Sequence, residues 1–265
     1  MKPSGVITLL TDFGTKDPYV GAMKGVILSI NPEARIVDIA HEVEPQDIRG
    51  AAFCMLGYLD YFPRGTVHVC VVDPGVGSSR RAVAIKTRDF YLVGPDNGVF
   101  TLALDRFGCE EIVLLENRDL LMPHISQTFH GRDIFAPAAA HISSGVGLDR
   151  FGPQIDEPVR FDWSGVRVEA DRMVGQIVHF DRFGNAITNI DEAAVREFLA
   201  GAVPIVSVGG WSISGLASSY AEAVGGKLCA VIDSYGFVEI AVPMGDARKL
   251  LRLNLGDEVW IRRGE

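Results

Sequence analysis

The chain has 265 residues, of which 48% are hydrophobic and 22% charged, and its mean hydropathy is +0.19. This length and composition are typical of one large or two modest globular domains, and they exclude a disordered or collagen-like chain. With 25 Lys and Arg against 34 Asp and Glu, the formal charge of −9 repels phosphate backbones and anionic lipid, so nucleic acid is not an expected partner.

Neither a membrane nor a disulfide framework is expected. No apolar run approaches the roughly 20 residues that span a bilayer, and the N-terminal segment enters a strand-like pattern without a signal peptide's apolar core, which predicts a cytoplasmic protein. Scattered cysteines without a CxxC pair are expected to be free buried thiols; they are Cys54, Cys70, Cys109 and Cys229.

Short apolar strands alternate with amphipathic helices over the first half of the chain. The patterns predict strands at 6–10, 34–39, 65–72, 81–86 and 91–93, and helices at 19–30, 47–62, 100–107 and about 134–144. This alternation predicts an α/β domain with a central, largely parallel sheet over residues 1–160, in which polar residues at strand ends line the binding crevice. Asp12 and Asp73 both stand at such ends.

The second half of the chain has a different pattern. From about Gly145 to Ser164 it is polar and contains prolines, which indicates a linker or crossover. Short strands with glycine turns and one strong helix at 192–199 then predict a small β-barrel or sandwich over residues 170–265. The expected strands are 174–178, 186–190, 203–208, 228–232, 238–241 and 258–261.

Two segments of the first half could carry chemistry. Val71–Arg81 puts Asp73 after a buried strand and before a glycine loop that lets a ligand approach the backbone; the alternative is a turn in which Asp73 caps amides. Thr128–Asp133 places His130 ahead of a helix, where a purely structural histidine is the alternative. There is no dinucleotide fingerprint, P-loop or metal-ligand spacing, so no metal or cofactor is expected.

Two segments of the second half have a similar character. Phe180–Ile190 places Asp181 and Asn185 around a Phe-Gly turn, where they could bind a polar ligand or close a hairpin through their own hydrogen bonds. Asp233–Met244 runs from a turn into a strand with Glu239 among apolar neighbours, and an inward carboxylate there needs a partner.

Together with Thr11–Gly14, these segments resemble the S-adenosyl-L-methionine (SAM) hydroxide adenosyltransferases, a family related to the fluorinases and chlorinases. The motifs occur in order along nearly the whole chain: TDFG, VVDPGVGSSR, GPDNG, TFHGRD, FDRFGNAITNI and SYGFVEIAV. The resemblance implies an α/β domain followed by a C-terminal β-barrel. It also implies hydrolysis of SAM to adenosine and L-methionine by in-line hydroxide attack at ribose C5′, with no metal.

The family's catalytic Asp, Arg and His fall on Asp73, Arg80 and His130. Because the sulfonium is already a leaving group, this triad need only position water and remove its proton. The resemblance places substrate-binding residues in both halves: Asp12 for the ribose hydroxyls with Phe13 beside it, Phe129 as an apolar wall, Asp181 and Asn185 for the methionine or ribose polar groups, and Ser234, Tyr235, Glu239 and Met244 for the carboxylate and adenine.

Departures from the halogenating relatives favour hydroxide over halide. Asp73 and Val76 stand where those relatives have tyrosine and threonine, and a carboxylate at this point repels a halide ion. Tyr235 replaces an arginine that follows the serine, which changes recognition of the methionine carboxylate. The resemblance further implies a homotrimer, with each site formed between one subunit's N-terminal domain and its neighbour's barrel.

Two other functions are consistent with the same residues. Asp12, Asp73 and His130 could hold a divalent metal in a phosphoesterase-like site, and activity that survives EDTA would exclude this. A non-catalytic adenosine or SAM sensing module would bind without turnover and would be indifferent to Asp73→Ala.

Overall fold

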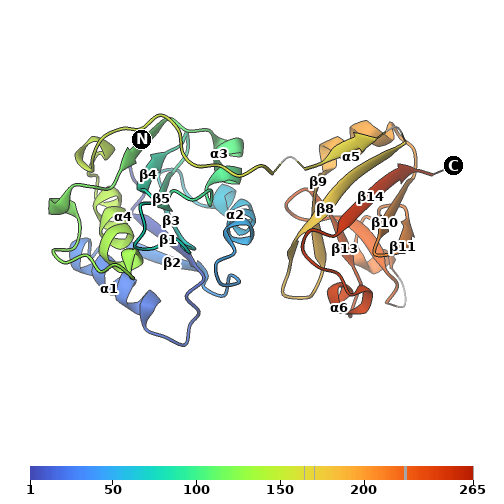
Figure 1. Cartoon of the computed structure of the whole chain (residues 1–265), viewed down its shortest axis with the longest axis horizontal. Coiled ribbons are helices and arrows are strands. Elements are labelled where there is room, and N and C mark those ends of the chain that lie inside the picture. Colours follow the sequence, from blue (N-terminus) through green and yellow to red (C-terminus); the bar gives the residue numbers. More distant parts are fainter. Residues whose placement is uncertain (164, 170, 224–225, 265) are drawn as a thin grey trace. The chain divides into compact units, whose positions relative to one another are not determined.

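The computed structural model describes residues 1–163, 165–169, 171–223 and 226–264. Within these ranges the chain divides into two compact units, Met1–Phe161 and Asp162–Glu265, which Figure 1 shows as an α/β unit and a β-rich unit. Each unit has a hydrophobic core of its own, as is usual for separately packed domains.

The N-terminal unit is built on a six-stranded sheet with strand order β2-β1-β3-β5-β4-β6. Neighbours along β2-β1-β3-β5 pair in parallel, whereas β4 runs antiparallel to both β5 and β6. The predicted α/β domain with a central, largely parallel sheet is therefore confirmed. Its strands are β1 (Val6–Thr11), β2 (Arg35–Ala40), β3 (Val67–Val71), β4 (Ala82–Lys86), β5 (Tyr91–Pro95) and β6 (Glu111–Leu114).

Helices cover both faces of this sheet because its central strands are apolar on both sides. In β1, Ile7 and Leu9 pack into one core with Met23 and Ile27, while Leu10 belongs to the core on the other face. The first face carries α1 (Tyr19–Ile30) and α4 (Ala136–Ser143), and the second carries α2 (Ile48–Leu56) and α3 (Thr101–Phe107) (Figure 1).

Two predictions in this unit need correction. The helix expected at 47–62 ends at Leu56, and a separate 3-10 turn follows at Leu59–Tyr61. The segment 145–164, expected to be a linker, packs onto the N-terminal unit as far as it is described: Phe151 is fully buried and Gln154 bridges β6. Ser164, at the end of that expected linker, lies outside the described residues.

The C-terminal unit is an antiparallel sheet that curls nearly into a closed barrel. Its strand order is β11-β10-β14-β8-β9-β13-β12, with β7 added beside β8. A bridge between Ala217, just after β11, and Val231 of β12 brings the two ends of this path together. The predicted C-terminal β-barrel is confirmed. The strands are β7 (Arg167–Glu169), β8 (Arg172–Phe180), β9 (Ala186–Asp191), β10 (Pro204–Val208), β11 (Trp211–Ser214), β12 (Cys229–Ile232), β13 (Phe237–Ala241) and β14 (Glu258–Arg263).

Two helices accompany the barrel. α5 (Glu192–Leu199) occupies the predicted range, and the side chain of Asp191 caps it by accepting the N–H of Ala194. α6 (Ala247–Leu251) was not predicted from the sequence, because five residues are too few to show helical periodicity.

Among the described residues, no helix combines the length and apolar character needed to cross a membrane. All four cysteines are free thiols; Cys70 and Cys229 are buried, and Cys54 is half-buried. The expectation of burial is wrong for Cys109, which is exposed because it lies in the connection between α3 and β6.

Candidate active site

Two acidic side chains follow neighbouring strands of the N-terminal sheet. Asp12 comes directly after β1 and Asp73 two residues after β3, and these strands pair in parallel with Thr11 opposite Val71. Carboxyl ends of parallel strands share one edge of a sheet, so both carboxylates belong to that edge. At the end of β5, Asn97 donates its side-chain N–H to the carbonyl of Val72 at 2.9 Å and so fixes the chain just before Asp73.

Arg80 connects the other two members of the predicted triad. Its Nε donates to both carboxylate oxygens of Asp73, at 2.9 and 3.0 Å, and its Nη2 lies 2.7 Å from Nδ1 of His130. The side chains of Arg80 and Asp73 are only 9% and 5% exposed. The structure thus brings Asp73, Arg80 and His130 into one hydrogen-bonded chain, while the neighbouring Arg81 pairs with Asp96 instead.

The hydrogen-bond partners define the state of His130. A guanidinium has no acceptor, so Nδ1 accepts from Arg80 and the proton of the neutral ring is assigned to Nε2. Burial lowers the pKa of His130, the charge of Arg80 lowers it further, and the nearby carboxylates of Asp73 and Asp133 oppose this. The ring is therefore neutral near pH 7, with an N–H on Nε2.

A glycine brings the two loops of the triad into contact. Gly77 has a φ of +78°, and a Cβ there would lie 2.4 Å from the carbonyl oxygen of Gln127, in the segment that leads to His130. His130 itself precedes a π-helical turn at Gly131–Phe135, so helical structure starts three residues earlier than the predicted start at Ile134. Such π-turns occur frequently at functional sites.

Three aromatic rings form an apolar cluster beside the triad segment. The predicted wall residue Phe129 lies edge-on to Phe13 at 5.9 Å and to Tyr19 at 5.2 Å between ring centres. Phe13 also contacts Tyr19, at 5.9 Å. Sequence reasoning missed Tyr19, which resembled an ordinary residue at the start of an amphipathic helix. Half of its surface remains exposed, so the cluster can still cover a planar ligand.

A cavity of about 440 Å³ in the C-terminal unit collects most of the predicted residues of that half. Asp181, Ser234, Tyr235 and Glu239 line it. Its other lining residues are His179, Ile187, Ser218, Ser219, Tyr220, Val231, Ile232 and Asp233. With three carboxylates and no lysine or arginine among the described lining residues, the cavity suits a cationic group.

Glu239 has the partner that an inward carboxylate requires. The hydroxyl of Tyr220 donates to its Oε1 at 2.7 Å, and the Glu239 residue is 4% exposed. Burial raises the pKa of Glu239 to about 7, helped by Asp181 and Asp233 and opposed by the hydrogen bond from Tyr220. Sequence reasoning missed Tyr220, since it lies 19 positions away in a segment without a motif.

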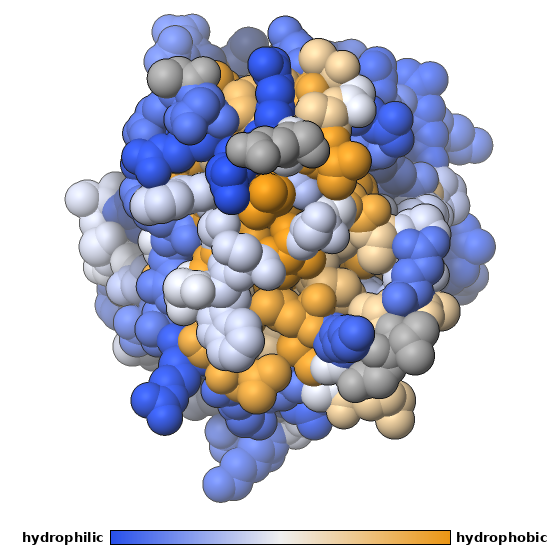
Figure 2. Space-filling view, turned by 90° about the vertical axis from the view of Figure 1, so that its right-hand side faces the viewer, coloured by the Kyte–Doolittle hydropathy of each residue, from blue (hydrophilic) through white to orange (hydrophobic). Residues whose placement is uncertain are grey.

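The remaining two predicted residues of this half differ in position. Asn185 does not line the cavity; its side chain and backbone N–H both donate to Asp181, at 2.9 and 2.8 Å, and hold that carboxylate in place. Met244 is fully exposed, has a φ of +61° and is not among the cavity's lining residues. Figure 2 shows that apolar side chains gather in the middle of one face of this unit, bordered by hydrophilic ones.

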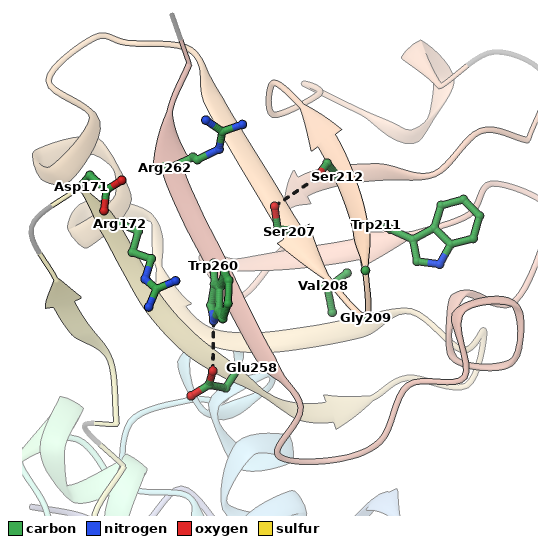
Figure 3. A pocket seen from close by; sticks show the side chains of 11 residues that line it. Asp171, Arg172, Ser207, Val208, Gly209, Trp211, Ser212, Glu258, Trp260 and Arg262 are labelled. Carbon is green, nitrogen blue, oxygen red and sulfur yellow. Dashed lines mark hydrogen bonds between the residues drawn. The ribbon is translucent and has the colours of Figure 1, made fainter.

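A larger hollow of about 540 Å³ lies over β8, β10, β11 and β14 (Figure 3). There the guanidinium of Arg172 stacks 4.2 Å from the ring centre of Trp260, and Glu258 pairs with Arg167. No predicted site residue is among its described lining residues, and two of its four charged lining residues, Arg172 and Glu258, already have partners in the chain. The acidic cavity is thus the better candidate site of this unit.

The described residues do not include a group of three or more His, Cys, Asp or Glu side chains arranged to hold a metal ion. The metal-site interpretation of Asp12, Asp73 and His130 therefore has no support in this geometry. Nδ1 of His130 is already paired with the guanidinium of Arg80, a cationic group that would repel a metal ion at this nitrogen.

The chain thus combines an α/β unit, with a hydrogen-bonded Asp-Arg-His chain at its sheet edge, and a barrel with an acidic cavity. Family models match both parts: the SAM hydroxide adenosyltransferase N-terminal domain over residues 7–152 and the C-terminal domain over 175–260. The chain belongs to the SAM hydroxide adenosyltransferase family.

Individual relatives agree with this assignment. An (R)-S-adenosyl-L-methionine hydrolase of Methanocaldococcus jannaschii is 41% identical over 97% of this chain and 95% of its own length. An uncharacterized conserved protein from Thermotoga maritima has a similar crystal structure, with a TM-score of 0.91 and 42% identity over 97% of this chain and all of that one. A fluorinase of Nocardia brasiliensis is more distant, at 27% identity over 74% of each chain.

Proposed function

We propose that this protein hydrolyses SAM to adenosine and L-methionine, with Asp73, Arg80 and His130 as its catalytic residues. The observation that carries the proposal is the hydrogen-bonded chain of these three side chains at the carboxyl edge of the sheet. Relatives named (R)-S-adenosyl-L-methionine hydrolase support it, because two of them, 41% and 40% identical, match 97% and 94% of this chain.

In this mechanism the oxygen of a water molecule attacks C5′ of the ribose as the bond from C5′ to sulfur breaks. The bonding electron pair stays on sulfur, which becomes the neutral thioether of methionine, and the water loses one proton to solvent by way of Asp73. No general acid is needed, since the sulfonium departs without a proton. The N–H on Nε2 of His130 and the charge of Arg80 stabilise the hydroxide-like oxygen.

Each unit supplies part of the proposed substrate site. Asp12 accepts the ribose hydroxyls, and the cluster of Phe13, Tyr19 and Phe129 covers the apolar part of the nucleoside. The carboxylates in the C-terminal cavity, among them Asp181, suit the α-ammonium group of the methionine moiety. The finer assignment of Ser234, Tyr235, Glu239 and Met244 to carboxylate and adenine belongs to the same proposal.

We further propose a homotrimer whose sites combine one subunit's N-terminal domain with its neighbour's barrel. The support is the apolar surface that a single chain leaves exposed, a feature common at interaction sites. Phe183, next to the Asp181 turn, is 73% exposed, and Met244 is entirely exposed.

Incubation of the purified chain with SAM, followed by separation of the products, tests the hydrolase. Because the relatives' names specify the (R) form, the two sulfonium epimers are assayed separately, with and without EDTA and chloride. We expect adenosine and methionine, produced equally with EDTA, and loss of turnover in Asp73→Asn and His130→Ala.

Arg81→Lys serves as a control, because Arg81 pairs with Asp96 outside the triad and its substitution should leave turnover intact. Formation of 5′-chloro-5′-deoxyadenosine would instead indicate a halogenase. Tight binding of SAM without turnover, unaffected by Asp73→Asn, would indicate the sensing module.

A further inference from the structure

A series of polar contacts leads from the surface of the N-terminal unit to the turn Thr11–Gly14, which carries Asp12. Nε2 of His41 lies 3.0 Å from Oδ1 of Asp38, and Nδ1 of His41 lies 2.9 Å from the hydroxyl of Thr11. That hydroxyl in turn accepts the backbone N–H of Phe13 at 3.2 Å. Thr11 is fully buried and His41 is 7% exposed, so the contact between them is shielded from water, whereas the Asp38 side chain is 44% exposed.

The contact between Thr11 and His41 holds the imidazole ring in place whichever of the two groups donates. A hydroxyl has one proton and two lone pairs, so the Thr11 oxygen accepts the N–H of Phe13 and still forms a hydrogen bond with Nδ1 of His41. On the other side of the ring, Nε2 lies beside the carboxylate of Asp38. Burial tends to raise the pKa of Asp38, but its contacts with Lys24 and His41 outweigh burial and lower it, so the carboxylate is charged.

The segment that begins at His41 contacts the same turn through its backbone. The carbonyl of His41 accepts the N–H of Gly14 at 2.7 Å, and the N–H of Gln46 donates to Oδ2 of Asp12 at 2.8 Å. Gln46 has a φ of +69°, a left-handed conformation that costs a non-glycine residue energy and persists only where surrounding contacts enforce it. Contacts from residues 41–46 therefore reach all four residues of the turn Thr11–Gly14, with Phe13 held through Thr11.

We infer that His41 is a positioning residue, which holds Asp12 and Phe13 in the orientation that binds the ribose. This inference rests on the proposed function only in assigning Asp12 and Phe13 to the nucleoside. His41 acts through Thr11 and the turn and does not touch the substrate. Its removal therefore weakens nucleoside binding, while the catalytic chain through Arg80 stays intact.

The same strand offers a matched control. The hydroxyl of Thr8 contacts Nδ1 of another buried histidine, His68, at 2.8 Å, and both residues are fully buried. Thr8 lies three residues before Thr11 in β1, directly opposite His68 of β3, inside the core and away from the site edge. Thr8→Val and Thr11→Val thus delete the same kind of contact, and only the second acts on the turn.

The experiment compares Thr11→Val, Thr11→Ser, His41→Phe and Thr8→Val in the full chain. For Thr11→Val and His41→Phe we expect the KM for SAM and the Kd for adenosine, measured by calorimetry, to rise about five- to tenfold, the scale of one or two lost hydrogen bonds, with kcat within about twofold. Thr11→Ser, which keeps the hydroxyl, should restore both constants. Thr8→Val should lower the melting temperature and leave KM unchanged.

Equal KM values for folded Thr11→Val and the parent chain would overturn the inference, as would equal effects of Thr8→Val and Thr11→Val on KM. If His41→Phe does not fold, the two threonine variants decide the outcome. A parent chain that binds adenosine but does not hydrolyse SAM overturns the proposed function alone, because the adenosine Kd still tests His41. A parent chain that binds no adenosine overturns both.

Discussion

Arg80 is the side chain on which the geometry of the candidate triad depends. Its planar guanidinium makes a fork to both oxygens of Asp73 and still reaches Nδ1 of His130. Its flat face also lies 5.3 Å from the ring centre of Phe135, which fixes the plane of the fork. A lysine keeps the charge in this position, but it can neither donate paired hydrogen bonds to the carboxylate nor stack a planar group on Phe135.

We therefore expect Arg80→Lys to lower kcat by about 100-fold, the scale of one misplaced catalytic contact, with a smaller effect on KM. The measurement is steady-state turnover of SAM, accompanied by a melting curve to show that the variant is folded. Arg81→Lys is the matched control, since it makes the same chemical change one residue away. Similar losses in both variants would contradict the special role of Arg80.

Glu239 makes the free energy of unfolding of the C-terminal unit depend on pH. With a pKa of about 7 in the folded protein against an ordinary 4.5, it binds a proton in the folded state that the unfolded chain has already released. Between these two values the free energy of unfolding falls as the pH rises. Burial of the charged form is the cause, so the loss is complete only above pH 7.

Glu239→Gln removes this titration while keeping an acceptor for Tyr220. We expect the free energy of unfolding of the variant, measured in urea, to depend less on pH between 5 and 8. At pH 8 it should be about 1 to 2 kcal/mol higher than that of the parent. Tryptophan fluorescence reports on this unit alone, because Trp163, Trp211 and Trp260 all belong to it. Glu197→Gln, on the exposed side of α5, should leave the pH dependence unchanged.

Residue patterns in the sequence located much of the candidate site but not the contacts between its members. Asp73 and Glu239 stood out because a polar group at a strand end, or within an apolar strand, is conspicuous. The partner of Glu239 could not be predicted, since Tyr220 reaches it only after the barrel has folded. Met244 was assigned by motif alignment alone, and within a single chain it does not join the cavity.

At the scale of elements, the loop after β3 depends on a glycine. Gly77 lies against the backbone of Gln127 with a positive φ, so the loop that carries Asp73 packs directly on the segment that carries His130. A side chain at this position faces a backbone carbonyl, which cannot move aside as a flexible side chain would.

Gly77→Ala should separate the two loops, lowering kcat by at least about tenfold and stability by roughly 1 to 3 kcal/mol. Gly108→Ala is the control: Gly108 has a similar φ of +74°, but nothing lies within 4 Å of its added Cβ. That change should cost about 1 to 3 kcal/mol, because its φ of +74° with a ψ of 174° is a conformation nearly confined to glycine, and it should leave kcat intact. Turnover assays and urea unfolding of both variants decide between loop packing and a general cost of positive φ.

Elements with a clear period were predictable, and those defined by distant contacts were not. α1 and α5 have the ranges that their patterns indicated, since apolar residues recur at helical spacing and α5 has a capping aspartate. The short strands β7 and β11 were not predicted, because three or four residues are too few to show an alternating pattern. They form by pairing with β8 and β10. Polar, proline-containing chain at 145–161 resembled a linker although Phe151 anchors it.

At the scale of the whole molecule, the predicted residues are divided between two units. The triad and the aromatic cluster belong to residues 1–161, whereas the acidic cavity belongs to residues 162–265. Neither unit alone carries groups for every part of SAM: the first has the proposed ribose and attack groups, and the second has the groups suited to a cation. If the proposed function holds, a complete site needs one copy of each unit, from the same chain or from two chains.

Mixing two inactive variants distinguishes these possibilities. Asp73→Asn disables the N-terminal unit and Asp181→Asn the C-terminal unit, and each alone should lose most activity. If the sites form between neighbouring subunits, co-refolded mixed trimers contain sites in which both contributing units are intact, and an equal mixture should recover about a quarter of parent activity by random assortment. If each site lies within one chain, every site keeps one defect and mixing restores nothing. Size-exclusion chromatography of the mixture checks that trimers have formed, and a fully active monomer would contradict the shared site.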